Sequence, residues 1–145
     1  MHSLNDPQLM REIIMDHYQN PRHRGLVDDD SYQKINMNSE TCIDNLDIQV
    51  KFDGDKISDI RYDGEACAIC TSSTSIMTEL LIGKTLEEAQ NIIDNYMNMI
   101  YERDYDPEVL EEAIAFSNTH KQANRIKCAT LGWNGVVELM KEREE

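Results

Sequence analysis

Four cysteines and one aspartate are the residues of this chain whose types and spacing could support metal or sulfur chemistry. Cys42 and Asp44 lie two positions apart, so their side chains point to the same side if this segment is extended. Cys67 and Cys70 form a Cys-x-x-Cys pair, and Cys128 ends the basic segment "RIKC". Thiolates together with a carboxylate can hold a zinc ion or anchor an iron–sulfur cluster. The alternative is that the cysteines are small buried hydrophobic residues.

The spacing alone does not decide between these interpretations. The intervals from Cys42 to Cys67 and from Cys67 to Cys128 are much longer than those of zinc fingers. The positions of Cys42, Asp44 and Cys67 favour a metal site, because all three fall at junctions between predicted elements, where functional groups concentrate. A redox pair at Cys67 and Cys70 is less favoured, since a thioredoxin-like motif needs a βαβ context and the preceding strands look like a hairpin.

Charge and composition narrow the possible partners. The chain has 145 residues, with 28 acidic and 14 basic side chains and a net charge of −14. Such a surface repels phosphate groups, so we expect neither nucleic acid nor membrane as a partner. No apolar run approaches the roughly 20 residues that a bilayer-spanning helix requires.

The start of the chain, "MHSLNDPQLMREI", is polar and carries acidic residues, which is unlike a signal peptide. We therefore expect a cytoplasmic protein, in which thiols stay reduced. In that compartment the cysteines are better explained as metal ligands, nucleophiles or buried thiols than as disulfides.

The first half of the chain predicts one helix and a small sheet. Apolar residues recur at helical spacing over Pro7–Tyr18. Strict alternation predicts a strand over Leu46–Phe52, and the Asp53–Gly54 turn predicts a hairpin with a return strand behind it. A weaker alternation at Ile35 and Met37 predicts a further short strand.

The second half predicts helices. Helical spacing begins at Cys70, and Thr85 and Glu88 form a capping box that opens the next helix. A short helix is predicted after Pro107, and a long final helix begins near Asn124.

Gly132 and Gly135 interrupt this final helix, where each costs about 1 kcal/mol relative to alanine. We therefore expect another element to pack closely against them. Together the elements predict one α+β domain over residues 1–145. A small antiparallel sheet of about three strands has helices packed on one face, namely the N-terminal helix and the helical C-terminal half. The histidines are expected at surface or packing positions rather than as ligands.

Three separated motifs resemble a known family. The segments "TCID", "YDGEACAICTSSTS" and "RIKCATLGW" are similar to the motifs of the U-type iron–sulfur scaffold proteins, IscU and SufU. That family carries Cys-Gly-Asp, then Gly-x-Gly-Cys-x-Ile-Ser, then Arg-x-x-Cys. The segment "MREIIMDHYQNPRHRG" resembles its opening helix and asparagine–proline turn, so the likeness covers nearly the whole chain. The long segment between Lys84 and Arg125, and Lys127 in place of a histidine, resemble the SufU branch of Gram-positive bacteria.

The resemblance implies both a function and a set of site residues. Cys42, Asp44, Cys67 and Cys128 would form a Cys3Asp site for Zn²⁺ or for a transient iron–sulfur cluster, with Cys42 as the acceptor of sulfane sulfur. The implied partners are a cysteine desulfurase of the SufS type and apo iron–sulfur acceptor or carrier proteins. Such a protein is a scaffold or a zinc-dependent sulfurtransferase rather than a conventional enzyme.

Five residues depart from the family pattern or lie beside its ligands. Ile43 and Ala66 replace glycines, and Cys70 replaces a serine. We expect Cys70 to be a packing residue, with a spare ligand or a sulfur relay as alternatives. Arg125 and Lys127 either support the neighbouring thiolate and meet a partner, or are solvated charges. Two other functions stay open: a structural zinc domain that only binds proteins, and an inactive paralogue impaired at Ile43.

Overall fold

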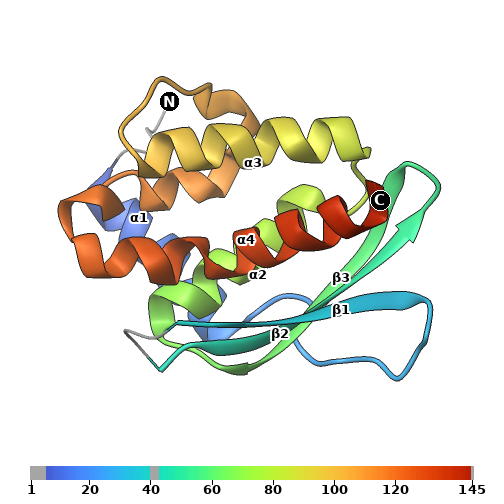
Figure 1. Ribbon diagram of the computed structural model, residues 1–145. Coiled ribbons are helices and arrows are strands. Elements are labelled where there is room, and N and C mark those ends of the chain that lie inside the picture. The colour runs from blue at the N-terminus through green and yellow to red at the C-terminus, as the bar shows by residue number, and fades with distance from the viewer. Residues whose placement is uncertain (1–5, 40–42, 145) are drawn as a thin grey trace.

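A computed structural model describes residues 6–39 and 43–144, apart from the side chains of residues 120, 123, 124 and 144. Three antiparallel strands form a sheet in the order β1-β2-β3, and the helices lie on one side of it (Figure 1). This is the α+β architecture predicted from the sequence. The elements are α1 (Pro7–Gln19), β1 (Tyr32–Asn38), β2 (Asn45–Asp53), β3 (Lys56–Glu65), α2 (Ala68–Leu81), α3 (Leu86–Ile100), the 3₁₀ turns η1 (Pro107–Val109), η2 (Glu111–Phe116) and η3 (Thr119–Lys121), and α4 (Ala123–Glu144).

Local signals fix most of these elements. Asp6 caps α1 by accepting the N–H of Gln8 at 2.9 Å. Thr85 and Glu88 form the predicted capping box of α3, with both reciprocal hydrogen bonds present. In β2, alternate apolar side chains are buried until a bulge between Lys51 and Phe52 disturbs the register.

The start of α2 differs from the sequence prediction. The helix begins at Ala68, two residues before the predicted start at Cys70. Cys67 lies at a junction of elements, as predicted: β3 ends at Glu65, and Cys67 is the N-cap of α2. Periodicity could not reveal this, because a cap is recognised by its contact with the first turn and not by apolar spacing.

The backbone after Pro107 is wound more tightly than the predicted helix. In place of one short helix, the chain forms the two 3₁₀ turns η1 and η2. The second turn buries the side chains of residues 113–116 against the helices.

Both glycines of α4 mark close packing, as predicted. A Cβ atom added to Gly132 would lie 2.5 Å from Oγ1 of Thr74 in α2. A Cβ atom on Gly135 would lie 3.0 Å from side-chain atoms of Ile48 and Met37 in the sheet. At both glycines the backbone of α4 therefore packs directly on side chains of α2 and the sheet, so its position relative to both is closely defined.

A buried polar group, here called the Ser73 cluster, joins α2, α3 and α4. Its members are Ser73, Tyr96, Ala129 and Trp133. The indole N–H of Trp133 donates to Oγ of Ser73 at 3.0 Å, and the Ser73 hydroxyl donates to the carbonyl of Ala129 at 2.6 Å. The Tyr96 hydroxyl donates to the same carbonyl at 2.8 Å. The rings of Tyr96 and Trp133 stack with their centroids 3.8 Å apart.

Candidate metal centre

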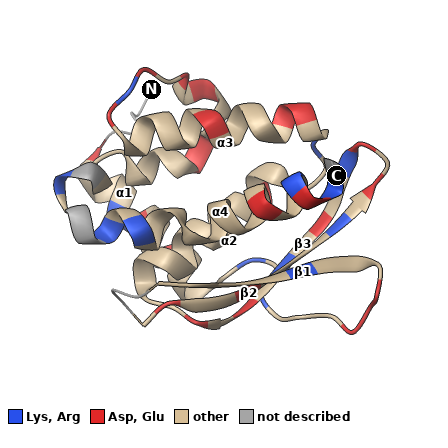
Figure 2. Ribbon diagram, viewed as in Figure 1, with Lys and Arg blue, Asp and Glu red and all other residues tan. Residues whose placement is uncertain are grey.

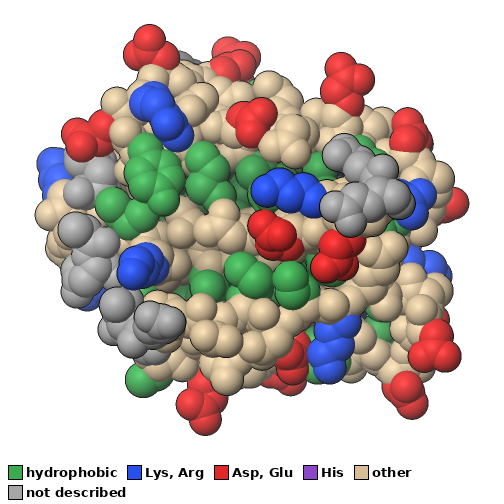
Figure 3. Space-filling model, in the orientation of Figure 1, with side chains coloured by type: hydrophobic (Ala, Val, Ile, Leu, Met, Phe, Trp, Pro, Cys, Tyr) green, Lys and Arg blue, Asp and Glu red, His purple; other side chains and the backbone are tan. Residues whose placement is uncertain are grey.

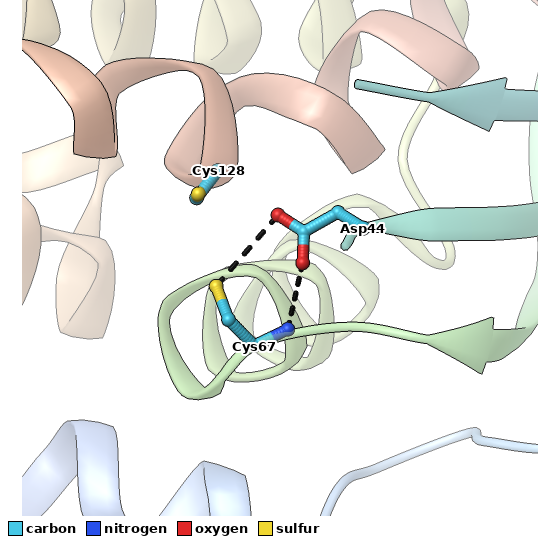
Figure 4. A group of neighbouring side chains, drawn as sticks. All are labelled: Asp44, Cys67 and Cys128. Carbon is cyan, nitrogen blue, oxygen red and sulfur yellow. Dashed lines mark hydrogen bonds between the residues drawn. The ribbon is translucent and has the colours of Figure 1, made fainter. Parts of the chain in front are cut away.

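Three side chains from distant parts of the chain meet at one end of the sheet. Asp44 lies just before β2, Cys67 caps α2, and Cys128 lies near the start of α4. Their side chains point toward one another (Figure 4). One potential ligand atom from each lies within 4.8 Å of the other two. Among the residues that the structure describes, this is the one group of three or more possible ligands that meets this distance.

The position of Asp44 depends on a close approach of two backbones. Gly64 in β3 pairs with Leu46 in β2 and has a φ of +137°. A Cβ atom there would lie 2.2 Å from the carbonyl oxygen of Asn45, so only glycine fits. By contrast, Ala66 is not among the described non-glycine residues with positive φ, so its replacement of a family glycine brings no left-handed strain.

Asp44 is linked directly to Cys67. Its carboxylate is almost fully buried, and Oδ1 accepts the backbone N–H of Cys67 at 2.7 Å. The thiol of Cys67 lies 3.7 Å from Oδ2 of Asp44 (Figure 4). The Cys67 sulfur also accepts the N–H of Cys70 at 3.4 Å. The first turn of α2 therefore holds the Cys67 sulfur at a helix N-terminus, where negative charge is favoured.

Cys128 is positioned by the helix crossing. Its side chain is buried, and the next residue, Ala129, supplies the carbonyl at the centre of the Ser73 cluster. The contact of Gly132 with Thr74 lies one turn further along α4. These contacts place the Cys128 sulfur opposite the N-terminus of α2.

The donor set fits a thiophilic metal ion. In a tetrahedral site with zinc–sulfur bonds of about 2.3 Å, neighbouring ligand atoms lie roughly 3.5–3.8 Å apart. The Cys67 sulfur and the Asp44 carboxylate are already 3.7 Å apart, and the whole group spans no more than 4.8 Å. Two thiols and one carboxylate leave room for a fourth ligand, and zinc or an iron–sulfur cluster would suit such a set.

The other sequence candidates fall around this group. Cys42, the expected sulfur acceptor, lies outside the described residues. Ile43 is 69% exposed beside the centre. Cys70 is fully buried in the core, as expected for a packing residue, and it does not belong to the three-ligand group.

Basic side chains border the centre. Arg125 and Lys127 are both exposed on the first turns of α4, which carry blue segments in Figure 2. Arg125 lines a groove of about 460 Å³ together with Arg11 and Ile69. Lys127 lines a second hollow of about 350 Å³ with Asn38. Figure 3 shows acidic side chains around the edge of this face and basic side chains scattered among them, so the surface that surrounds the core is of mixed charge.

His17 and His23, the two histidines whose side chains the structure describes, serve packing roles, as expected. His17 is fully buried, with Nδ1 2.7 Å from Oγ of Ser75 and Nε2 3.2 Å from Oε1 of Glu112. Nδ1 of His23 lies 2.9 Å from the hydroxyl of Thr78. Neither histidine belongs to the three-ligand group.

None of the helices in the described ranges is long and apolar enough to cross a bilayer.

Comparison with known proteins gives consistent matches. The family described as NifU-like N terminal domain matches residues 9–128. The chain is 36% identical to the zinc-dependent sulfurtransferase SufU of Bacillus subtilis, covering 94% of this chain and 92% of that protein. It is 37% identical to the iron–sulfur cluster assembly scaffold protein IscU of Streptococcus pyogenes, covering 92% and 83%. A crystal structure of a candidate scaffold protein for the SUF system from Fervidobacterium islandicum superposes with a TM-score of 0.81 at 33% identity, covering 86% and 90%.

Proposed function

Because this chain belongs to the family of NifU-like N-terminal domains, we propose that it acts in iron–sulfur cluster assembly as an acceptor of sulfane sulfur and as a scaffold. The sulfur donor would be a cysteine desulfurase of the SufS type, and the recipients would be apo iron–sulfur proteins or carriers. A named SufU relative and a named IscU relative, each more than one-third identical, support the two roles.

The observation that carries this proposal is the convergence of Asp44, Cys67 and Cys128 from three distant segments to within 4.8 Å. We assign these three as metal ligands and Cys42 as the fourth ligand and sulfur acceptor. A bound zinc ion would keep the thiols deprotonated near neutral pH and order their loops. The carboxylate is a harder ligand than a thiolate, so it holds a soft ion or cluster less firmly, which suits a protein that must release its cargo.

The sulfur-acceptor role is tested by desulfurase assays on the zinc-loaded protein. We expect the wild-type chain to accelerate alanine release by a SufS-type desulfurase and to carry a persulfide that mass spectrometry locates at Cys42. Cys42→Ser should abolish both effects. Asp47→Asn, which changes a carboxylate in β2 outside the centre, is the control and should leave both unchanged.

Three results would change the assignment. Full sulfur acceptance by Cys42→Ser would remove Cys42 from this role. Stoichiometric zinc without any desulfurase stimulation would favour a structural zinc domain. If stimulation is absent but is gained in Ile43→Gly, the chain is an inactive paralogue impaired at Ile43.

The scaffold role has a separate test. Anaerobic reconstitution with ferrous iron and sulfide should give visible charge-transfer absorption that decays as the cluster passes to an apo-ferredoxin. We expect Cys67→Ser to prevent this absorption. Absence of absorption in the wild-type chain would leave sulfur acceptance as the function of the centre.

A further inference from the structure

Cys67 and Cys70 lie on the same first turn of α2 with very different exposure. Cys67 is the N-cap, it is partly exposed, and its sulfur faces the candidate metal centre. Cys70 is three residues further on and is 0% exposed. The pair therefore consists of an outer thiol that solutes can reach and an inner thiol that they cannot.

The two residues are close enough to be joined. The Cys67 sulfur accepts the backbone N–H of Cys70 at 3.4 Å, so it lies over the residue that carries the inner thiol. Helix geometry places Cα atoms three residues apart about 5 Å from each other, within the span of about 4.4–6.8 Å that a disulfide bridges. The spacing of the two Cα atoms is therefore compatible with a Cys67–Cys70 disulfide.

We propose that this pair reduces sulfane sulfur to sulfide inside the protein. This proposal rests on the proposed sulfur-acceptor function, and it adds an activity that the ligand set alone does not provide. Cluster assembly needs sulfur as sulfide, whereas a persulfide carries it two electrons more oxidised. The Cys67–Cys70 pair holds those two electrons.

The reaction balances without another reagent. The Cys67 sulfur attacks the outer sulfur of the Cys42 persulfide, which returns Cys42 to a thiol and leaves the persulfide on Cys67. The Cys70 sulfur then attacks the Cys67 sulfur. The Cys67–Cys70 bond forms as the bond between Cys67 and the sulfane sulfur breaks. The outer sulfur leaves with both electrons of that bond, and with the proton given up by Cys70 it departs as hydrogen sulfide. A dithiol then restores the pair by thiol–disulfide exchange.

The burial of Cys70 gives this step its selectivity. The inner thiol cannot react with solutes, so its accessible target is whatever Cys67 carries. With serine at this position, as in the family pattern, the step could not occur. The activity is thus a property of this chain, and replacing Cys70 tests it without removing a proposed metal ligand, because the Cys70 side chain lies outside the three-ligand group.

The test is a single-turnover reaction of the full chain after chelation of metal. One equivalent of glutathione persulfide is added without other reductant, and the reaction is quenched with monobromobimane. We expect about one sulfide per chain, and a Cys67–Cys70 disulfide within the tryptic peptide of residues 62–84. In Cys70→Ser, sulfide should fall below about a tenth of that value, and Cys67 should retain its persulfide.

Cys70→Ala serves as a second variant because serine is poorly suited to a buried site, and both variants keep the backbone N–H that contacts Cys67. Equal sulfide release from wild type and both variants would overturn the inference, as would a stable Cys67 persulfide beside a reduced Cys70 in the wild-type chain. Neither result touches sulfur acceptance. A chain that acquires no persulfide at any cysteine and releases no sulfide would overturn the proposed acceptor function and this inference together.

Discussion

The Ser73 cluster and the candidate metal centre are adjacent polar sites that both include residues of α2 and α4, yet they are built in opposite ways. In the Ser73 cluster, each of the three side-chain donors has an acceptor, and all members are buried. In the metal centre, two thiols and a carboxylate face one point, and one thiol is partly exposed. The first site is closed, whereas the second can take up a ligand.

The two sites therefore have different roles: the Ser73 cluster holds the helices in place, and the metal centre can exchange its ligand. A fully satisfied buried network is rigid, because any displacement leaves a polar group without a partner. Ala129 belongs to that network and Cys128 precedes it, so the closed site fixes one ligand of the open site. Exchange at the metal centre is therefore expected without movement of α4.

Removal of a thiol ligand should have the largest effect on the metal centre. Cys67→Ser should lower zinc affinity by more than about 100-fold, measured by competition with a chromogenic chelator. Serine is a good N-cap, so the metal-free protein should keep its free energy of unfolding within about 0.5 kcal/mol. Unchanged zinc affinity would exclude Cys67 as a ligand, and Asp47→Asn is the matched control.

The next effect concerns the helix crossing. Gly132→Ala forces a Cβ atom against Thr74 and should cost about 1–3 kcal/mol of unfolding free energy in urea. Because the crossing positions Cys128, zinc affinity should fall as well. Asn134→Ala, at an exposed position of the same helix, should lower neither the free energy of unfolding nor the zinc affinity. A stability loss without any change in zinc affinity would separate the crossing from the metal centre.

A pair of tyrosines tests whether the Ser73 cluster is closed. Tyr96→Phe removes the donor to Ala129 and should cost about 1–3 kcal/mol, measured by urea unfolding. The hydroxyl of Tyr62 is also buried, but it has no hydrogen-bond partner in the described part of the chain. Tyr62→Phe should therefore cost less than about 0.5 kcal/mol or stabilise the fold. Equal losses would contradict the distinction between partnered and unpartnered hydroxyls.

The smallest effect is on alkaline stability. Burial raises the pKa of Tyr62 to about 12, so the folded state favours the neutral ring. That contribution is complete below the unfolded value of about 10 and is lost as the pH rises toward 12. At pH 11, Tyr62→Phe should recover about 1 kcal/mol of the loss measured by urea unfolding. Tyr101→Phe, at an exposed position, is the control and should recover none.

Local patterns were sufficient for most of the fold. The alternation in β2, the capping box of α3 and the proline that opens α1 each act over a few residues, so they can be predicted without knowledge of the tertiary structure. The close packing at Gly132 was also predictable, because an interior glycine in a helix needs a reason. Cys67 as an N-cap and the 3₁₀ turns after Pro107 were not, since both depend on contacts that periodicity does not encode.

Element junctions pointed to Cys42, Asp44 and Cys67, but the full ligand set with Cys128 was predictable only through family resemblance. Nothing in the spacing of Asp44, Cys67 and Cys128 shows that they meet. Their convergence depends on the β2–β3 register at Gly64 and on the crossing of α4 over α2, which are both tertiary features. The tolerance of Ala66 likewise follows from a backbone angle that the sequence does not reveal.

The C-terminal end of α4 also contacts the sheet. The Arg143 guanidinium stacks over the ring of Phe52, 4.9 Å from its centroid, and also donates to the carbonyl of Gly54 in the hairpin turn. The helix is thus held in place at two points, one at the hairpin turn and one near Cys128. Shortening the C-terminus would remove the contacts at the hairpin turn. The position of the Cys128 sulfur, at the opposite end of the sheet, would then be less well defined.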